Sequence, residues 1–531
     1  MNTAASDTTK PKTSRVWDLR AVAPFNALAL LLVLGALAND NFISVANLSN
    51  VITRSAFIAI IALGATYVIS SGGLDLSVGA MVAFVASLMI LFMNSGVIAD
   101  PLLMLIAGMA LALAIGAACG LFNGLITTVG QIEPFIATLG TMGIYRGLTT
   151  WLSQGGAITL RDRELQALYR PVYFGEVLGV PVPIIAIFVT AAIAAFVLYR
   201  TRYGRHLIAV GSNEDVARYS GISVKRVRTI AYVVQGLCVA IAVLLYVPRL
   251  GSTSATTGIL WELQAITAVV VGGTALRGGV GRIWGTVCGA FILEIVGNIM
   301  ILSNFVSEYL IGAIQGAIII IAMLVQRSLS RRSWEPSGRQ GSRPGGRQDP
   351  NLGERNMRRR TFGLTVAALA ASVAMGPSLG WAQEEKKVTI GVSIPAADHG
   401  WTAGVVYHAE RVAKLLMEEH PGLTVLVKTS ADPATQANAV QDLAVQGIDA
   451  LVILPTDPDP LVNAIQQVKD AGTFVALVDR APSNNDNGVR DLYVAGNNPA
   501  LGRVAGEYIA ETTPDAKVAI IRGLPIPIDQ Q

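Results

Sequence analysis

Residues 101–127 read PLLMLIAGMALALAIGAACGLFNGLIT, a run of 27 residues without a charged side chain. An α-helix needs about 20 consecutive apolar residues to cross the hydrocarbon core of a bilayer. This run is therefore long enough to form one membrane-spanning helix. The whole 531-residue chain is 52% hydrophobic and 14% charged, which is too apolar for an ordinary soluble domain. We therefore expect a polytopic membrane protein over much of the chain.

Nine further apolar stretches accompany this run. The ten predicted spans are residues 21–39, 55–71, 77–94, 101–127, 134–152, 183–199, 229–249, 262–276, 283–303 and 306–326. Between Arg200 and Arg228 the chain carries seven basic and two acidic residues, whereas the loop 153–182 has no net charge. Loops rich in Lys and Arg stay in the cytoplasm, so the basic loop and the tail 1–20 are predicted to face that side. Six spans separate them, and an even number returns the chain to the same side.

Glycines recur at four-residue spacing in several spans. They are Gly116, Gly120 and Gly124, the pair Gly285 and Gly289, and the pair Gly312 and Gly316. Small residues on one helix face allow backbones to approach closely in lipid, so a compact bundle is expected, although glycine is also simply common in membrane helices. The three cysteines are Cys119, Cys238 and Cys288. All lie in apolar spans, so no disulfide framework is predicted.

One acidic residue stands between two apolar spans. The segment SSGGLDLSVGA covers residues 70–80 and contains Gly72, Gly73, Asp75 and Ser77. An ionisable side chain at membrane depth is costly and usually functional, and the glycine pair indicates an interrupted helix. Alternatively, the Asp75 carboxylate caps the helix that starts near Ser77. The two roles are compatible.

Three long motifs in this region resemble the permease subunit of ribose-type bacterial ATP-binding-cassette (ABC) importers. They are GGLDLSVGA (residues 72–80), GRHLIAVGSNEDVARYSGISVKRVR (residues 204–228) and AVVVGGTALRGGVGRIWGT (residues 268–286). The resemblance covers residues 20–326. It implies three partners: an ABC ATPase subunit, a second copy of the permease and a periplasmic sugar-binding protein.

In that family the cytoplasmic loop before the later helices docks on the ATPase. The resemblance places docking at residues 213–223 of this chain. The expected docking residues are Gly211, Asn213, Glu214, Asp215, Ala217 and Gly221. Gly211 and Gly221 would bound a short helix. The alternative is a solvated loop whose positive charge only keeps it in the cytoplasm.

The chain contains no ATPase motif of its own. The pattern G-x-x-x-x-G-K-[ST] is absent from the sequence, and the glycine-rich residues 272–282 lack its Lys-Ser/Thr ending. ATP hydrolysis is therefore expected from a separate subunit, and no enzymatic activity, cofactor or metal site is predicted for this chain. The small net charge of +4 indicates no nucleic-acid partner.

A second protein start is indicated in the middle of the chain. Residues 327–360 hold ten arginines among Gly, Pro, Ser and Gln, which predicts a disordered linker. Residues 361–382 are Ala-rich and weakly apolar, and end with the small residues Gly380 and Ala382, as a cleavable signal peptide does. An eleventh span is the alternative. Because three arginines follow Met357, we hypothesise that two adjacent reading frames have been joined there.

Residues 383–531 have the composition of a soluble α/β domain. Strand-like runs such as VTIGVSI and ALVILP alternate with helical stretches at residues 402–419 and 434–446. This alternation predicts a doubly wound parallel sheet, whose ligands bind at the carboxyl ends of the strands. The residues expected at those ends are Asp398, His399, Trp401, Asp432, Thr456, Asp457, Asp479, Arg480, Asn497 and Asn498. Taken singly, each could equally be a helix cap or a surface residue.

This domain resembles the ribose-type periplasmic sugar-binding proteins, notably in QDLAVQGIDALVILPTD (residues 441–457) and VALVDR (residues 475–480). The resemblance implies hydrogen bonds from a sugar to Asp479 and Arg480 and stacking on Trp401. The predicted sugar site also includes Asp398 and Asn497. The loop 397–401 departs from the family pattern, and so does Leu454, where an asparagine is usual. Because the chain ends after the sixth predicted strand, we expect one of the family's two lobes.

We therefore predict the membrane subunit of an ATP-driven monosaccharide importer, carrying an incomplete sugar-binding domain. It would lie in the bacterial inner membrane, in contact with lipid, with residues after 382 in the periplasm. Its ligand would be a small-molecule sugar. Two other functions stay open: a non-ATP transporter or channel, and a membrane-tethered sugar sensor.

Overall fold

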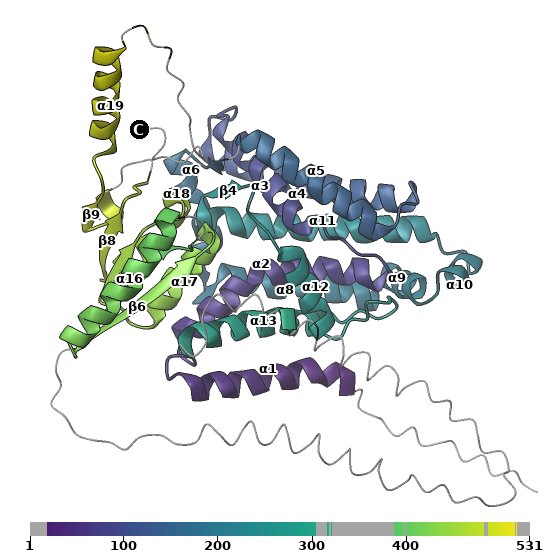
Figure 1. Ribbon diagram of the computed structural model, residues 1–531. Helices are drawn as coiled ribbons and strands as arrows, with labels where there is room; N and C mark the ends of the chain where they lie inside the picture. Colours follow the sequence, from purple (N-terminus) through teal and green to yellow (C-terminus); the bar gives the residue numbers. More distant parts are fainter. Residues whose placement is uncertain are drawn as a thin grey trace, which may run out of the picture. The chain divides into compact units, whose positions relative to one another are not determined.

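The computed structural model describes residues 19–154, 156–303, 387–397, 400–482 and 487–513, with a few isolated positions besides. It contains a helical domain, coloured purple to teal in Figure 1, and an α/β domain, coloured green to yellow. Most of the tenth predicted span, the linker 327–360 and the segment 361–382 lie outside the described residues. Asp398 and His399 lie outside them as well.

The helical domain has a helix at each of the nine predicted spans that fall among the described residues. These are α1 (Leu19–Ala38), α2 (Val45–Ser70), α3 (Val78–Asn94), α4 (Pro101–Thr128), α5 (Pro134–Ser153), α8 (Val182–Arg200), α11 (Val224–Leu250), α12 (Trp261–Val271) and α13 (Ile283–Ser303). Within the described part of the chain, five are long and apolar enough to cross a membrane: α2, α4, α8, α11 and α13. The span predicted at 262–276 is too long, because the left-handed backbone of Gly273 (φ 87°) follows the end of α12.

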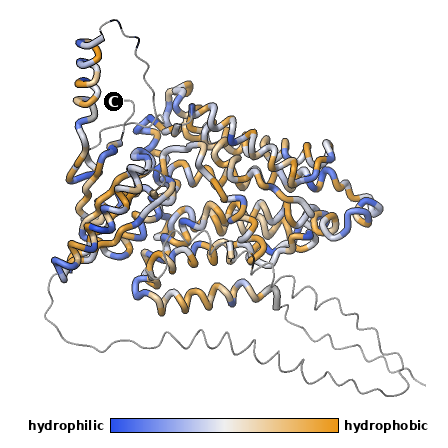
Figure 2. Tube along the Cα trace, in the orientation of Figure 1, coloured by the Kyte–Doolittle hydropathy of each residue, from blue (hydrophilic) through white to orange (hydrophobic). Residues whose placement is uncertain are grey.

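Short elements mark the two ends of the helical bundle. Helices α9 (Arg202–Ser212) and α10 (Glu214–Tyr219) lie at one end, and α6 (Arg163–Tyr169) and β4 (Ser252–Ser254) lie toward the other (Figure 1). We call these the α10 end and the β4 end. Strand β4 pairs antiparallel with β1 (Ala157–Thr159). Figure 2 shows hydrophilic residues gathered at the α10 end, while the helices between the two ends are mostly hydrophobic.

The centre of the bundle is a close contact between the backbones of α4 and α11. A Cβ atom added to Gly236 would lie 2.0 Å from the carbonyl oxygen of Gly116, and one added to Gly116 would lie 2.4 Å from that of Gly236. One turn along α4, a Cβ on Gly120 would lie 2.2 Å from the carbonyl oxygen of Tyr232. Real Cβ contacts are not this short, so only glycine allows the two helices to approach in this way.

A second predicted glycine pair also brings two helices together. A Cβ added to Gly285 in α13 would lie 2.0 Å from the carbonyl oxygen of Gly272, and one added to Gly289 would lie 2.1 Å from that of Ala268. The predicted close packing is therefore confirmed for two of the three glycine groups. In the third group, Gly312 lies outside the described residues, and a Cβ on Gly316 would meet nothing within 4 Å.

The α/β domain has a parallel sheet with the strand order β6-β5-β7-β8-β9, which confirms the predicted fold. Its strands are β5 (Val388–Pro395), β6 (Leu423–Ser430), β7 (Ala450–Ile453), β8 (Phe474–Val478) and β9 (Leu492–Val494). Its helices are α16 (Gly400–Glu419), α17 (Pro433–Val445), α18 (Pro458–Asp470) and α19 (Asn498–Thr512). The sixth predicted strand, at residues 517–523, lies almost wholly outside the described residues.

Both faces of this sheet are covered, as a doubly wound fold requires. Val406 of α16 packs with Ile394 and Leu454 on one face. On the other face Leu443 of α17 and Ile465 of α18 are fully buried with the strand residues. All the strand pairs are parallel, so their carboxyl ends share one edge of the sheet.

The contact between α4 and α11 generates a first prediction. Gly236→Ala should greatly reduce the yield of monodisperse protein in detergent size-exclusion chromatography, because the added methyl overlaps a carbonyl of α4. Overpacking of a tight interior costs about 1–3 kcal/mol. Gly143→Ala in α5 is the matched control, since a Cβ there would meet nothing within 4 Å. Equal yields for the two variants would contradict the packing argument.

Candidate functional site

Three sequence motifs from distant parts of the helical domain meet at the α10 end. Ser70 ends α2, Gly211 lies in the last turn of α9, and Gly278 and Gly279 lie between α12 and α13. The amide of Gly279 donates a hydrogen bond to the carbonyl oxygen of Ser70 at 2.9 Å. A Cβ added to Gly211 would lie 1.9 Å from that same oxygen, and one added to Gly278 would lie 2.7 Å from the carbonyl oxygen of Gly211. We call these four residues the glycine junction.

The predicted docking helix projects from this junction. Asn213 caps α10 by accepting a hydrogen bond from the amide of Val216 at 3.0 Å. Gly221 follows the helix in the left-handed conformation (φ 77°), and Ala217 is buried. Asp215 is exposed, and Tyr219 is 90% exposed. The helix thus presents polar and aromatic side chains to solvent. Gly211 does not bound it directly, because α9 continues to Ser212.

Arg228 connects this docking helix to the membrane-spanning core. Its Nη1 forms a salt bridge with Glu214 of α10 at 2.8 Å, and its Nε donates to the carbonyl oxygen of Ser71 at 3.2 Å. Glu214 also pairs with Arg218 at 2.6 Å. Arg228 was not predicted as a site residue. Its contact with Ser71 joins positions 157 residues apart, and no local pattern marks such a contact.

Asp75 lies in the turn before α3, inside a buried polar cluster. Its Oδ1 accepts hydrogen bonds from the amide of Ser77 at 2.9 Å and from the Ser77 hydroxyl at 2.7 Å. Asn123 of α4 donates to both carboxylate oxygens at 3.3–3.4 Å and to the Ser77 hydroxyl at 2.7 Å. Tyr145 of α5 donates to the side chain of Asn123 at 3.3 Å. Asp75 therefore fixes the N-cap residue Ser77 in the turn before α3 and joins this turn to α4, but it makes no capping bond to an amide of α3.

The two predicted glycines before Asp75 lie at the end of α2. Gly72 has φ 84°, so the chain turns there in a conformation that favours glycine. A Cβ added to Gly73 would lie 3.0 Å from the hydroxyl of Tyr232. That hydroxyl donates to the carbonyl oxygen of Leu74 at 3.0 Å. The interrupted helix expected from the glycine pair is therefore present, and α11 stabilises the interruption.

In the α/β domain, part of the predicted sugar site comes together at the carboxyl edge of the sheet. Arg480 donates from Nη1 to the carbonyl oxygen of Thr456 at 2.8 Å, and its Nε lies 3.8 Å from Oδ2 of Asp479. Asp479 has a left-handed backbone (φ 63°), which is unusual for a residue other than glycine. Trp401 is 50% exposed and lines a small apolar pocket with Leu454 and Val478.

Other predicted residues of this edge act as helix caps. Asp432 accepts from the amide of Thr435 at 2.9 Å and begins α17, and Asn497 accepts from the amide of Ala500 at 3.1 Å and begins α19. Asp457 begins α18, and burial, together with the neighbouring charge of Asp459, raises the pKa of the Asp457 carboxyl to about 6. Asp398 lies outside the described residues. Within those residues, no three His, Cys, Asp or Glu side chains are grouped as metal ligands.

Two family models match the chain, one to each domain. The model described as "Branched-chain amino acid transport system / permease component" matches residues 47–323. The model described as "Periplasmic binding protein domain" matches residues 390–526. Together they cover the helical domain from α2 onward and most of the α/β domain found in the structure.

Several permeases are similar to the helical part of the chain. The ribose import permease protein RbsC of Bacillus subtilis is 40% identical over 314 residues, which cover 59% of this chain and 94% of that protein. The RbsC protein of Escherichia coli is 37% identical, covering 56% of this chain and 91% of that protein. The D-allose transport system permease protein AlsC of E. coli is 31% identical, covering 59% and 93%. The chain therefore belongs to the family of ribose-type ABC importer permeases, and a periplasmic-binding-protein domain follows its permease domain.

Proposed function

We propose that this chain is the membrane subunit of an ATP-driven importer of a monosaccharide. The observation that carries the proposal is the glycine junction together with α10, which projects from it with exposed side chains. Arg228 ties α10 to Ser71, the residue next to the junction. Relatives named for ribose and D-allose import support a sugar as the cargo. Permeases of this family are not catalytic, so a separate ATPase subunit would dock at the α10 end.

The charge distribution supports a cytoplasmic location for the α10 end of the bundle. The exposed residues of α9 and α10 include Arg202, Arg205 and Arg218, and basic loops are retained on that side. The β4 end would then face the periplasm, together with the α/β domain. Further partners proposed from the family are a second permease copy and a free sugar-binding protein.

A sugar-binding role for the α/β domain rests on Asp479 and Arg480. A carboxylate next to a guanidinium offers charge-assisted hydrogen bonds to sugar hydroxyls. The exposed face of Trp401 offers a surface on which the C–H face of a sugar ring can stack. In this proposal Leu454 and Val478 make the floor beside Trp401 apolar.

Docking at α10 can be tested with Tyr219→Ala. This side chain is 90% exposed, so its removal should leave folding unchanged. Removing an aromatic side chain from the centre of an interface typically costs about 2 kcal/mol or more, so co-purified ATPase and its activity should fall at least about tenfold. Leu178→Ala is the matched control, since Leu178 is fully exposed and remote in sequence. Unchanged ATPase binding by Tyr219→Ala would remove α10 from the docking surface.

The role of Asp75 can be tested by two substitutions. Asp75→Asn keeps an oxygen acceptor for Ser77 and should retain most of the transport activity. Asp75→Leu leaves the buried amide and hydroxyl donors of Ser77 without their acceptor, at about 1–3 kcal/mol for each group, and should lower the amount of assembled protein. Sugar uptake normalised to folded protein gives the measurement. If Asn is as damaging as Leu, the negative charge itself is required.

The proposed sugar site can be tested with Arg480→Ala in the full chain. Loss of a hydrogen bond to a charged group costs about 1.5–3 kcal/mol, so the affinity for D-ribose or D-allose in equilibrium dialysis should fall about tenfold to a hundredfold. Glu507→Gln, on an exposed part of α19, is the control. Equal affinities for the two variants would exclude Arg480 from the site.

A further inference from the structure

Helix α5 carries an arginine in the middle of its span. Arg146 lies about 18 Å from the start of this helix at Pro134 and about 10 Å from its end at Ser153. The helix is about 30 Å long, which matches the thickness of the hydrocarbon core. A guanidinium at this depth is costly, so it faces protein or a water-filled cavity and not lipid.

Arg146 uses one of its nitrogen atoms to hold an irregular segment of the chain. Its Nη1 donates to the carbonyl oxygens of Ala255 and Thr257 at 2.5 and 2.6 Å. A guanidinium has five N–H donors, and these two bonds occupy both donors of Nη1. The Nε and Nη2 donors make no hydrogen bond within the described residues, and the side chain is partly exposed. These remaining donors are therefore available to a ligand.

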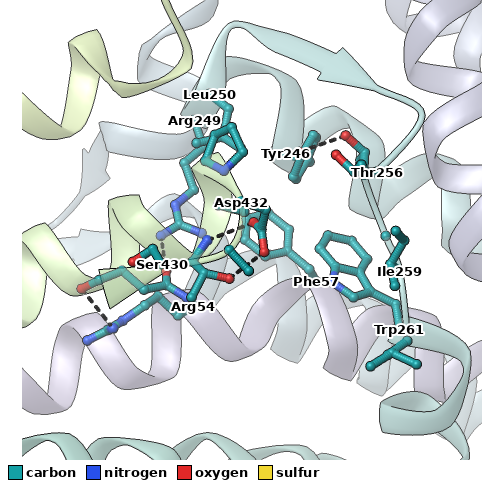
Figure 3. Close-up of a pocket in the computed structure, with 18 of the residues that line it drawn as sticks. Arg54, Phe57, Tyr246, Arg249, Leu250, Thr256, Ile259, Trp261, Ser430 and Asp432 are labelled. Atoms are coloured by element: carbon teal, nitrogen blue, oxygen red, sulfur yellow. Dashed lines mark hydrogen bonds between the residues drawn. The ribbon is translucent and has the colours of Figure 1, made fainter. Parts of the chain in front are cut away.

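The segment that Arg146 holds also lies at membrane depth. It comprises residues 255–260, and Figure 3 shows Thr256 and Ile259 along it on the way to Trp261, the first residue of α12. Helix α12 is about 16 Å long, roughly half the thickness of the hydrocarbon core, so the segment before it must enter the membrane. Ile259 is 53% exposed. Irregular backbone at such depth lies against protein or lines a water-filled cavity.

A carboxylate accompanies Arg146 at the start of α12. Glu262 and Arg146 attract each other electrostatically, but no ion pair joins the two described side chains. The Glu262 carboxylate is partly exposed and lies against the first turn of α3, where a Cβ added to Gly79 would lie 2.6 Å from its Oε2. A guanidinium and a carboxylate that do not pair offer hydrogen-bond donors and acceptors to a third molecule.

A purely structural role accounts for only part of this arrangement. Satisfying the carbonyl groups of Ala255 and Thr257 needs one nitrogen atom of the guanidinium. It explains neither the free Nε and Nη2 donors of Arg146 nor the carboxylate of Glu262 nearby. Charged groups within membrane spans pair with one another or face a water-filled path. Because these two groups do not pair, we expect water and cargo to reach them.

From this arrangement we infer that Arg146 and Glu262 form a binding site, inside the membrane, for the hydroxyl groups of a neutral monosaccharide that passes through the permease domain. The inference rests on the proposed function and names residues of the permease domain that hold the cargo. The Nε and Nη2 atoms of Arg146 would donate to sugar oxygens, and the Glu262 carboxylate would accept from sugar hydroxyls. An amino acid, the cargo named by the family model, is the competing ligand, because its carboxylate and ammonium groups fit the same two side chains.

The first measurement asks whether water reaches the site. Gly143→Cys in the full chain, in membrane vesicles, places a thiol one turn before Arg146, where a Cβ would meet nothing within 4 Å. A small, membrane-impermeant thiol reagent should label it, because the reactive thiolate forms only where water is present. The three native cysteines are buried, and the unaltered chain gives the background.

Ile193→Cys is the matched control for water access. Ile193 is 60% exposed and lies in the middle of α8, where we expect it to face lipid. It should therefore react at least about tenfold more slowly than Gly143→Cys. Equally slow labelling of the two variants would mean that no water reaches the surroundings of Arg146, and would overturn the inference.

The second measurement asks whether sugar occupies the site. D-ribose or D-allose at ten times its Kd should slow the labelling of Gly143→Cys about tenfold, because only the unoccupied site reacts. L-leucine should give no protection. Arg480→Ala in the α/β domain should leave the protection unchanged at saturating sugar.

Conservative substitutions separate cargo binding from a structural role. Glu262→Gln keeps the shape of the side chain but removes its charge, and Arg146→Lys keeps the charge but loses the forked donors. Each should weaken protection by sugar about tenfold to a hundredfold and leave labelling without sugar unchanged. Glu133→Gln is the control, since Glu133 is exposed before α5 and its side chain makes no capping bond. Protection that both variants retain in full, or that arises from L-leucine, would contradict the inference.

Uptake with the partner ATPase distinguishes this inference from the proposed function. If the unaltered chain supports sugar uptake but Glu262→Gln transports at the same rate as Glu133→Gln, only the site is wrong. If the unaltered chain neither transports nor is protected by any sugar tested, the proposed function is wrong as well.

Discussion

The close approach of α4 and α11 is the constraint on which the helical domain depends. In lipid, apolar side chains gain little by packing on one another, so helices associate through close packing and hydrogen bonds. Gly116 and Gly236 remove the side chains that would keep the two backbones apart. This contact fixes α11, whose two ends carry Arg228 and Tyr246. The position of α11 therefore decides where the residues at the two ends of the bundle lie.

An irregular segment interrupts the helical domain between α2 and α3. Because α2 ends at Ser70 and α3 begins at Val78, residues 71–77 turn inside the protein. Such a turn exposes backbone polar groups, and each observed contact satisfies one of them. Arg228 bonds to Ser71, Tyr232 bonds to Leu74, and Asp75 accepts from Ser77. The bonds from Arg228 and Tyr232 thus stabilise the interruption and also connect it to α11.

Sequence reasoning was strongest where a pattern is local. Apolar run length predicted nine helices among the described residues, and the alternation of strands and helices predicted the parallel sheet. The spacing of Gly116 and Gly120 predicted close packing but could not name α11 as the partner. Asp75 was predicted as a cap or a functional group; its carboxylate bonds to Ser77 and Asn123 in the turn before α3, and the choice between the two roles stays a prediction. Asp432 and Asn497 were expected at the sheet edge, and their side chains cap helices there.

The sequence by itself determined the membrane class, the positions of the spans, the side preferred by the basic loop and the α/β character of the second domain. These properties follow from hydropathy, periodicity and charge along the chain, which need no knowledge of contacts. Only the tertiary structure decided that Ser70, Gly211 and Gly279 meet, that Arg228 joins α10 to the end of α2, and that the rings of Phe57 and Trp261 stack on each other. The contacts of Ser70 with Gly279, of Ser71 with Arg228 and of Phe57 with Trp261 each join residues more than 150 positions apart, and only the packing of helices in three dimensions brings such residues together.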